Sequence, residues 1–101
     1  MEIENFGKRL AELRAKKNVS ARDMSLSLGM GLGYINNIEN GKNFPSMEVF
    51  FYICEYLEIS PSDFFNEELS NPAELNEVID DLKKLNSNQL EAVKMMVKQI
   101  K

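Results

Sequence analysis

Apolar residues recur at helical spacing from the start of the chain. A first helix is predicted over about residues 4–17, because its apolar positions fall three or four apart and form one core-facing stripe. These positions are Ile3, Phe6, Leu10 and Leu13. Asn18 and Ser20 then turn the chain, and Val19 between them is expected to fill the core.

Residues 20–41 predict two short helices with a break between them. Met24 and Leu28 lie on one face of the first helix, and Ile35 and Ile38 lie on one face of the second. Two short helices joined through a glycine-containing turn form a helix-turn-helix, whose second helix enters the major groove of DNA.

The ends of these two helices also have sequence signals. Ser20 is suited to cap the first helix, and Gly29 to end it in the left-handed conformation. The second helix is expected to start near Gly31 and to stop before Gly41.

A more apolar helix is predicted over about residues 47–57, after the capping residue Ser46. Its expected core residues are Met47, Phe50, Ile53, Cys54 and Leu57. Because a helix that is apolar nearly all round is covered on two sides, a second cover is expected over its other apolar residues. These are Val49, Phe51, Tyr52 and Tyr56. A short helix follows, with Ser60 as cap and Pro61 at its first position.

Two amphipathic helices are predicted in residues 69–101. The first has about fourteen residues and the apolar positions Leu75, Val78, Ile79, Leu82 and Leu85; the second has Leu90, Val93, Met96, Val97 and Ile100. We interpret them as a helical hairpin that packs or dimerises. They are the candidates to cover the aromatic face of the 47–57 helix, in the same chain or in a partner.

Composition agrees with a small globular protein. The 101 residues are 44% apolar and 28% charged, which fits one domain, or a small domain with an appendage. No apolar run approaches the roughly twenty residues that span a bilayer, and the first residues do not resemble a signal peptide. The single cysteine, Cys54, is expected to be a buried packing residue and fits a reducing cytoplasm.

The net charge of −4 is unevenly distributed. Residues 8–22 contain six cations, Lys8, Arg9, Arg14, Lys16, Lys17 and Arg22, against one anion, Glu12. Most acidic residues come after residue 47. This asymmetry permits a basic face for DNA and an acidic rear, and on charge alone a solvated basic helix with no partner is equally compatible.

No pattern for catalysis or a cofactor is found. The chain has no histidine, which excludes a histidine-based triad or zinc site, and one cysteine cannot form a thiolate cluster. The spacing of Gly29, Gly31 and Gly33 is not the dinucleotide-binding fingerprint. We therefore expect no enzyme activity, metal, cofactor or small-molecule ligand.

The helix-turn-helix stretch and the helices around it resemble the lambda-type repressors, Cro and the Xre regulators. The resemblance covers about residues 4–66 and is most specific at Ile35, Ile38-Glu39 and Gly41-Lys42. It implies an all-α, five-helix lambda repressor-like domain over residues 1–68. Residues 69–101, with their two predicted helices, lie outside this domain as an extension. It also implies a bacterial or phage transcriptional regulator that binds double-stranded DNA, which we expect to be a homodimer.

The resemblance also assigns roles to single residues. It implies that Arg14 pairs with Glu39 at the end of the recognition helix, where two unrelated surface charges are the alternative. With a recognition helix at about 31–40, the base edges would face Gly31, Leu32, Gly33, Asn36 and Asn37. Ser20, Arg22, Lys42 and Asn43 are placed for phosphates, and Tyr34 either reaches a phosphate or packs back onto the first helix of the motif.

Two positions depart from the family pattern. Ala21 stands where a glutamine commonly contacts the DNA backbone, and Gly31 and Gly33 stand where side chains that read bases are common. A second hypothesis therefore remains: a protein-interaction module of the same fold, antitoxin-like or accessory, that has lost DNA binding.

Overall fold

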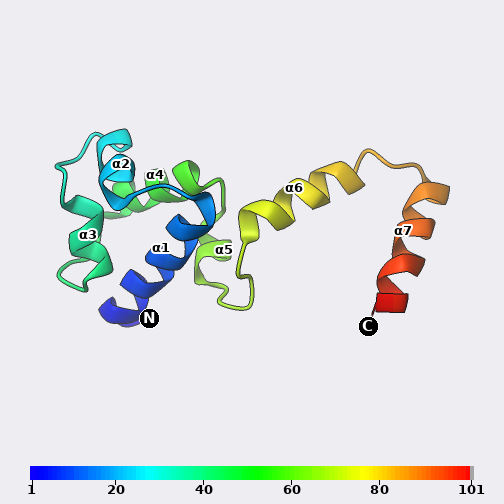
Figure 1. Ribbon diagram of the computed structural model, residues 1–101, viewed down its shortest axis with the longest axis horizontal. Coiled ribbons are helices and arrows are strands. Elements are labelled where there is room, and N and C mark those ends of the chain that lie inside the picture. The colour runs from blue at the N-terminus through cyan, green and yellow to red at the C-terminus, as the bar shows by residue number, and fades with distance from the viewer. Residues whose placement is uncertain (101) are drawn as a thin grey trace.

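A computed structural model describes residues 1–100, and within them the chain forms seven helices and no strand. The helices are α1 (Ile3–Lys17), α2 (Ala21–Ser27), α3 (Tyr34–Glu39), α4 (Met47–Leu57), α5 (Pro61–Phe65), α6 (Pro72–Leu82) and α7 (Ser87–Ile100). The predicted all-α class is therefore correct. Figure 1 shows a compact body made by α1–α5, from which α6 and then α7 extend.

The hydrophobic core lies among the first five helices. Close contacts join α1 to α3, α4 and α5, join α2 to α3, and join α4 to α5. The buried apolar residues are Phe6, Leu10, Leu13, Met24, Ile35, Ile38, Phe50, Ile53, Cys54, Leu57, Ile59 and Phe64. Most of the core positions predicted from apolar spacing are in this set, and Val19 and Leu28 pack against it. Ile3 and Met47 are not in the set.

Met47 was wrongly predicted as a core residue, since it is 66% exposed. It is the first residue of α4, directly after the cap Ser46, whose hydroxyl accepts a hydrogen bond from the Val49 N–H at 3.2 Å. At this end of α4 no other helix covers the side chain. Met47 instead lies at the rim of an open apolar groove.

Arg9 joins α1 to the segment around α5. It is only 2% exposed. Its guanidinium donates to the carbonyls of Phe64 at 2.6 Å, Asp63 at 2.8 Å, Asn66 at 2.9 Å and Leu69 at 3.0 Å. The assignment of Arg9 to a basic outer face was therefore wrong, because burial and these four acceptors remove its charge from the surface.

Gly7 allows α1 to approach the end of α3. A Cβ added to Gly7 would lie 2.6 Å from the carbonyl oxygens of both Ile38 and Glu39, a separation that no carbon–oxygen contact tolerates. Glycine is therefore required here by the backbone contact rather than by a turn.

The last two helices extend away from the body. Helix α6 is shorter than predicted: it ends at Leu82, so Leu85 lies outside it. Asn86 starts the next helix, because its side chain accepts from the Gln89 N–H at 2.9 Å and its own N–H donates to the Gln89 side chain at 3.1 Å. These bonds leave Leu85 in the turn that connects α6 and α7.

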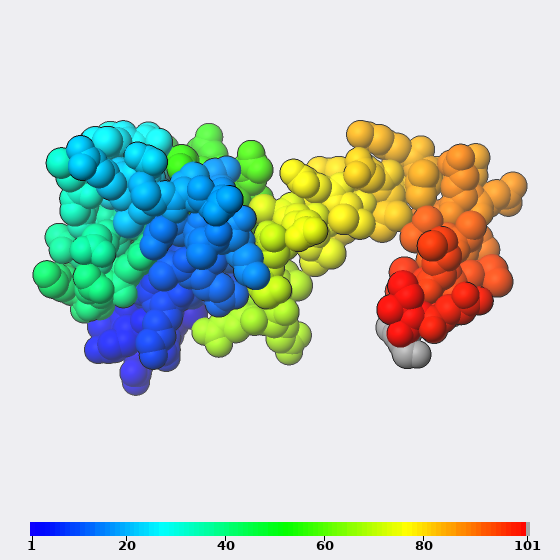
Figure 2. All heavy atoms as spheres, in the orientation of Figure 1, coloured from blue at the N-terminus to red at the C-terminus, as the bar shows by residue number. Residues whose placement is uncertain are grey.

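Neither α6 nor α7 covers α4 in this chain. Phe51 and Tyr52 are 51% and 49% exposed, and no residue of α7 is buried. In the space-filling view α7 stands apart from the body and is connected to it only through α6 (Figure 2). None of the seven helices within residues 1–100 is long and apolar enough to cross a membrane.

Candidate nucleic-acid interface

Helix α2 begins and ends as its sequence predicts. The Ser20 hydroxyl accepts a hydrogen bond from the Asp23 N–H at 3.0 Å and caps the helix. At the other end Gly29 has a φ of +73°, and the N–H groups of Gly29 and Met30 donate to the carbonyls of Leu26 and Ser25 at 3.0 and 2.9 Å. This left-handed ending turns the chain toward α3.

Helix α3 begins at Tyr34, so the prediction of a start near Gly31 was wrong. Residues 31–33 form a turn instead, because glycine at two of three positions disfavours helix. The Ser25 hydroxyl accepts a hydrogen bond from the Ile35 N–H at 3.0 Å and donates to the Ala21 carbonyl at 2.8 Å. Ser25 is fully buried, so its hydroxyl fixes the start of α3 against α2.

The end of α3 is fixed by its own backbone and by α1. Gly41 has a φ of +75°, and the Gly41 and Lys42 N–H groups donate to the carbonyls of Ile38 and Asn37, each at 3.0 Å. Because both ends of α3 are held, the side chains on its outer face have a fixed direction.

The predicted pair of Arg14 and Glu39 is confirmed. Arg14 Nε lies 2.6 Å from Glu39 Oε2, a second guanidinium nitrogen lies 2.9 Å from Glu39 Oε1, and a third contact of 2.8 Å reaches the Val19 carbonyl. The hydrogen bonds to Glu39 raise the pKa of Arg14, against a smaller opposing effect of burial. This two-point contact holds the end of α3 on α1.

Nine of the ten residues predicted to face DNA are exposed: Ser20 directly before α2, Arg22 on α2, Gly31, Leu32 and Gly33 in the turn, Asn36 and Asn37 on α3, and Lys42 and Asn43 after it. Tyr34 differs, because it is half-buried and packs against the core. Burial raises the pKa of its hydroxyl, which remains protonated.

The basic surface is smaller than the charge asymmetry of the sequence permits. Arg9 is buried and Arg14 is paired with Glu39, so neither contributes a free cation. Lys17 lies over the ring of Tyr56, 5.2 Å from its centroid. Of the exposed cations in residues 8–42, which are Lys8, Lys16, Lys17, Arg22 and Lys42, only Arg22 lies on α2 and only Lys42 directly follows the end of α3. Electrostatic attraction to phosphates near α2 and α3 therefore depends mainly on these two side chains.

Three residues that hold the helices of the body together were missed by sequence reasoning: Gly7, Arg9 and Ser25. A signal existed for two of them. Arg9 follows Phe6 by three positions and precedes Leu13 by four, which places it beside the apolar stripe. Gly7 lies seven positions before Arg14, so it shares the face of α1 that meets α3. Ser25 has no local signal, because its partner belongs to another helix.

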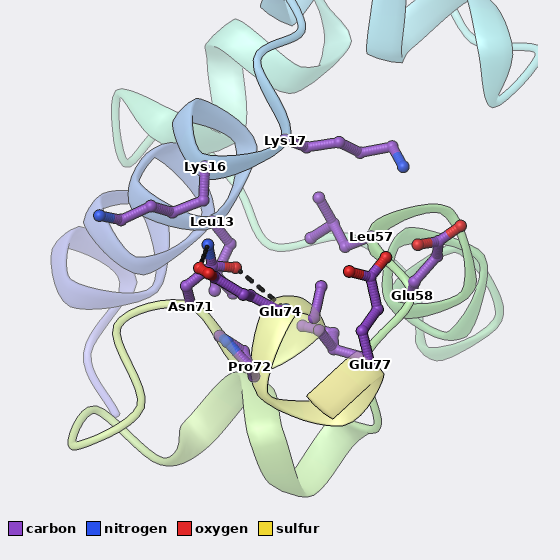
Figure 3. Close-up of a pocket in the computed structure, with 11 residues that line it drawn as sticks. Leu13, Lys16, Lys17, Leu57, Glu58, Asn71, Pro72, Glu74 and Glu77 are labelled. Atoms are coloured by element: carbon purple, nitrogen blue, oxygen red, sulfur yellow. Dashed lines mark hydrogen bonds between the residues drawn. The ribbon is translucent and has the colours of Figure 1, made fainter. Parts of the chain in front are cut away.

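A mixed-charge pocket of about 320 Å³ lies where α6 leaves the body (Figure 3). Lys16 and Lys17 reach it from the end of α1, and Glu74 and Glu77 from α6. Asn71 donates to Glu74 at 3.0 Å and caps α6. Residues of both signs of charge, from the end of α1 and from α6, therefore line this pocket.

Within residues 1–100 no group of three or more potential metal ligands, which here could only be Asp, Glu or Cys54, lies close enough together to hold a metal ion. The one thiol, Cys54, is buried as predicted, and burial together with the nearby Asp63 raises its pKa to about 11. A thiol with this pKa stays protonated at neutral pH and is a poor nucleophile.

Comparison with known families identifies residues 7–70, more than half of the chain, as a match to the model of a helix-turn-helix domain. The chain belongs to this helix-turn-helix family. The matched range covers α2 and α3 with the helices that support them, and it indicates a DNA-binding regulator in general terms. Comparisons with curated proteins and with solved structures give no match.

Proposed function

We propose that this helix-turn-helix protein is a sequence-specific transcriptional regulator of the lambda repressor, Cro and Xre type. The observation that carries the proposal is the fixed position of α3. Ser25 holds its start, Arg14 and Gly41 hold its end, and Asn36 and Asn37 remain exposed on its outer face.

Asn36 and Asn37 are the residues we assign to the bases. An asparagine side chain can bind the N6 and N7 atoms of adenine through two hydrogen bonds, worth about 1–3 kcal/mol of discrimination. Leu32 is 52% exposed in the preceding turn and is available to contact a thymine methyl group. Gly31 and Gly33 offer only backbone, so direct readout rests on few side chains and DNA shape contributes the rest.

The phosphate contacts are assigned to residues around α2 and after α3. Arg22 and Lys42 supply charge, and Ser20 and Asn43 supply uncharged hydrogen-bonding groups. The Tyr34 ring packs against the core, so its hydroxyl is the only part available for a phosphate. These contacts position the motif without reading sequence.

We propose further that the protein acts as a homodimer. The apolar stripes of α6 and α7 support this, since they remain largely exposed within residues 1–100. Two copies related by two-fold symmetry would bind a palindrome whose half-sites lie about one helical turn, roughly 34 Å, apart.

The test is selection from a random duplex pool, with binding measured over a salt series. We expect a palindromic site to be enriched, with affinity that falls steeply as salt rises. Asn37→Ala should reduce discrimination at one position of each half-site by about ten- to a hundredfold. Asn5→Ala is the matched control, because Asn5 is exposed on α1, outside the proposed contact face.

The alternative, a protein-interaction module without DNA binding, is supported by the small number of free cations beside α3. Its signature would be a folded wild-type protein that binds no duplex even at low salt. That outcome would refute the regulator proposal.

A further inference from the structure

An open apolar groove lies where the start of α1, the segment before α4 and the end of α5 meet. We call it the aromatic groove. It has a volume of about 390 Å³ and is lined by Met1, Phe6, Phe44, Met47, Phe50 and Phe65. Three of its rim residues are strongly exposed: Phe44 by 50%, Met47 by 66% and Phe65 by 49%. A patch of exposed aromatic surface of this kind marks a binding surface.

Two acidic residues adjoin lining residues of the groove in sequence. Glu2 and Glu48 directly follow the lining residues Met1 and Met47 in sequence and are exposed. A partner for the groove should therefore combine an apolar face with positive charge.

Helix α7 has both properties. Its apolar stripe consists of Leu90, Val93, Met96, Val97 and Ile100, and no residue of the helix is buried. Ile100 is 83% exposed. The helix carries Lys94 and Lys98 against the single anion Glu91, whereas residues 72–82 of α6 contain four anions and no cation. The charge of α7 thus complements Glu2 and Glu48 beside the groove, and that of α6 does not.

We propose that the aromatic groove of each copy binds α7 of a second copy. Aliphatic side chains would pack on the phenylalanine rings, with Lys94 and Lys98 beside Glu2 and Glu48. Helix α7 would bind the second copy rather than its own body, because α6 holds it away from that body (Figure 1). Four residues, 83–86, connect α6 to α7. This inference rests on the proposed homodimer and names the surface that forms it.

The chain offers a matched pair of substitutions on α7. Val97→Asp places a charge in the stripe, while Met95→Asp places one two positions away, on the opposite side of the helix. Both residues are about half exposed and contact no core residue, so neither change should unfold the body. In sedimentation equilibrium on the full chain, Val97→Asp should raise the dimer dissociation constant about tenfold or more. Met95→Asp should leave it nearly unchanged.

A cross-link distinguishes this arrangement from others. Cys54 is buried and is the only native cysteine, so added cysteines can be followed separately. We would mix a Met47→Cys chain with a Val97→Cys chain, oxidise the mixture and map the disulfide by mass spectrometry. The proposal predicts a disulfide between positions 47 and 97 of different chains.

Each other result overturns the proposal in a recognisable way. Dimers that form without a 47–97 link would leave the homodimer intact but exclude the groove as its surface. A 47–97 disulfide within one chain carrying both substitutions, at monomer mass, would show docking within the chain. Protein that stays monomeric at all concentrations would refute both the dimer and its surface. None of these measurements uses DNA, so they are independent of the DNA-binding proposal.

Discussion

The contact between α1 and α3 depends on the absence of a side chain at Gly7. The two helices approach so closely that a methyl group at this position would overlap the carbonyl groups of Ile38 and Glu39. Arg14, two turns later on the same helix, adds its ion pair to Glu39. One face of α1 therefore fixes the end of the recognition helix by steric fit and by charge.

Gly7→Ala should destabilise the protein by about 1–3 kcal/mol, because α1 and α3 must separate to admit the new methyl group. Urea unfolding followed by circular dichroism measures the change. Gly31→Ala is the matched control: a Cβ there meets nothing within 4 Å, so stability should change by no more than about 0.5 kcal/mol. Equal effects of the two substitutions would contradict the close contact.

Single residues were predictable from the sequence where the signal was local or belonged to the family pattern. Ser20, Gly29 and Gly41 act at their own helix ends, so a sequence window of a few residues was enough. The Arg14–Glu39 pair was expected from the family resemblance. Arg9 was misjudged because its acceptors lie more than fifty residues further along the chain, where no local pattern indicates them.

At the scale of the elements, the start of α3 shows the limit of local propensity. The two glycines explain why the helix does not begin at residue 31, but the actual start at Tyr34 is set by Ser25, ten residues before its partner Ile35. The turn of the motif is therefore defined jointly by weak helix propensity and by a buried hydroxyl.

Ser25→Ala should cost about 1–3 kcal/mol of stability, because it leaves the buried Ile35 N–H without an acceptor. The measurement is again urea unfolding, with Ser27→Ala as control, since Ser27 is exposed on the same helix. Amide hydrogen exchange at Ile35 should also become faster in the Ser25 variant. Unchanged exchange at that amide would show that Ser25 does not hold the start of α3.

At the scale of the whole molecule, the body and the C-terminal helices differ in how they are stabilised. The body has a continuous core shared by α1–α5, to which Ala73 of α6 also contributes. Helix α7 contributes nothing to that core. Folding of the body and association of two copies should therefore be separable.

A chain that stops after Leu85 tests this separation. It lacks α7 but keeps every residue of the core, so we expect it to unfold at nearly the same urea concentration as the monomeric full chain. Its mass in solution should be that of a monomer at concentrations where the full chain is a dimer. Loss of cooperative unfolding in the shortened chain would mean that α7 supports the body.

The sequence by itself determined the helices, most of the core, the capping residues and the helix-turn-helix motif. These features follow from apolar spacing and local hydrogen bonds, which are properties of neighbouring residues. The tertiary structure decided where α3 begins and that Arg9 is buried. It also decided that α1 contacts the end of α3 closely at Gly7, and that α7 does not cover α4 in its own chain. Each of these depends on residues far apart in sequence, because the close approach of backbones and the burial of a charge are decided only when helices pack together.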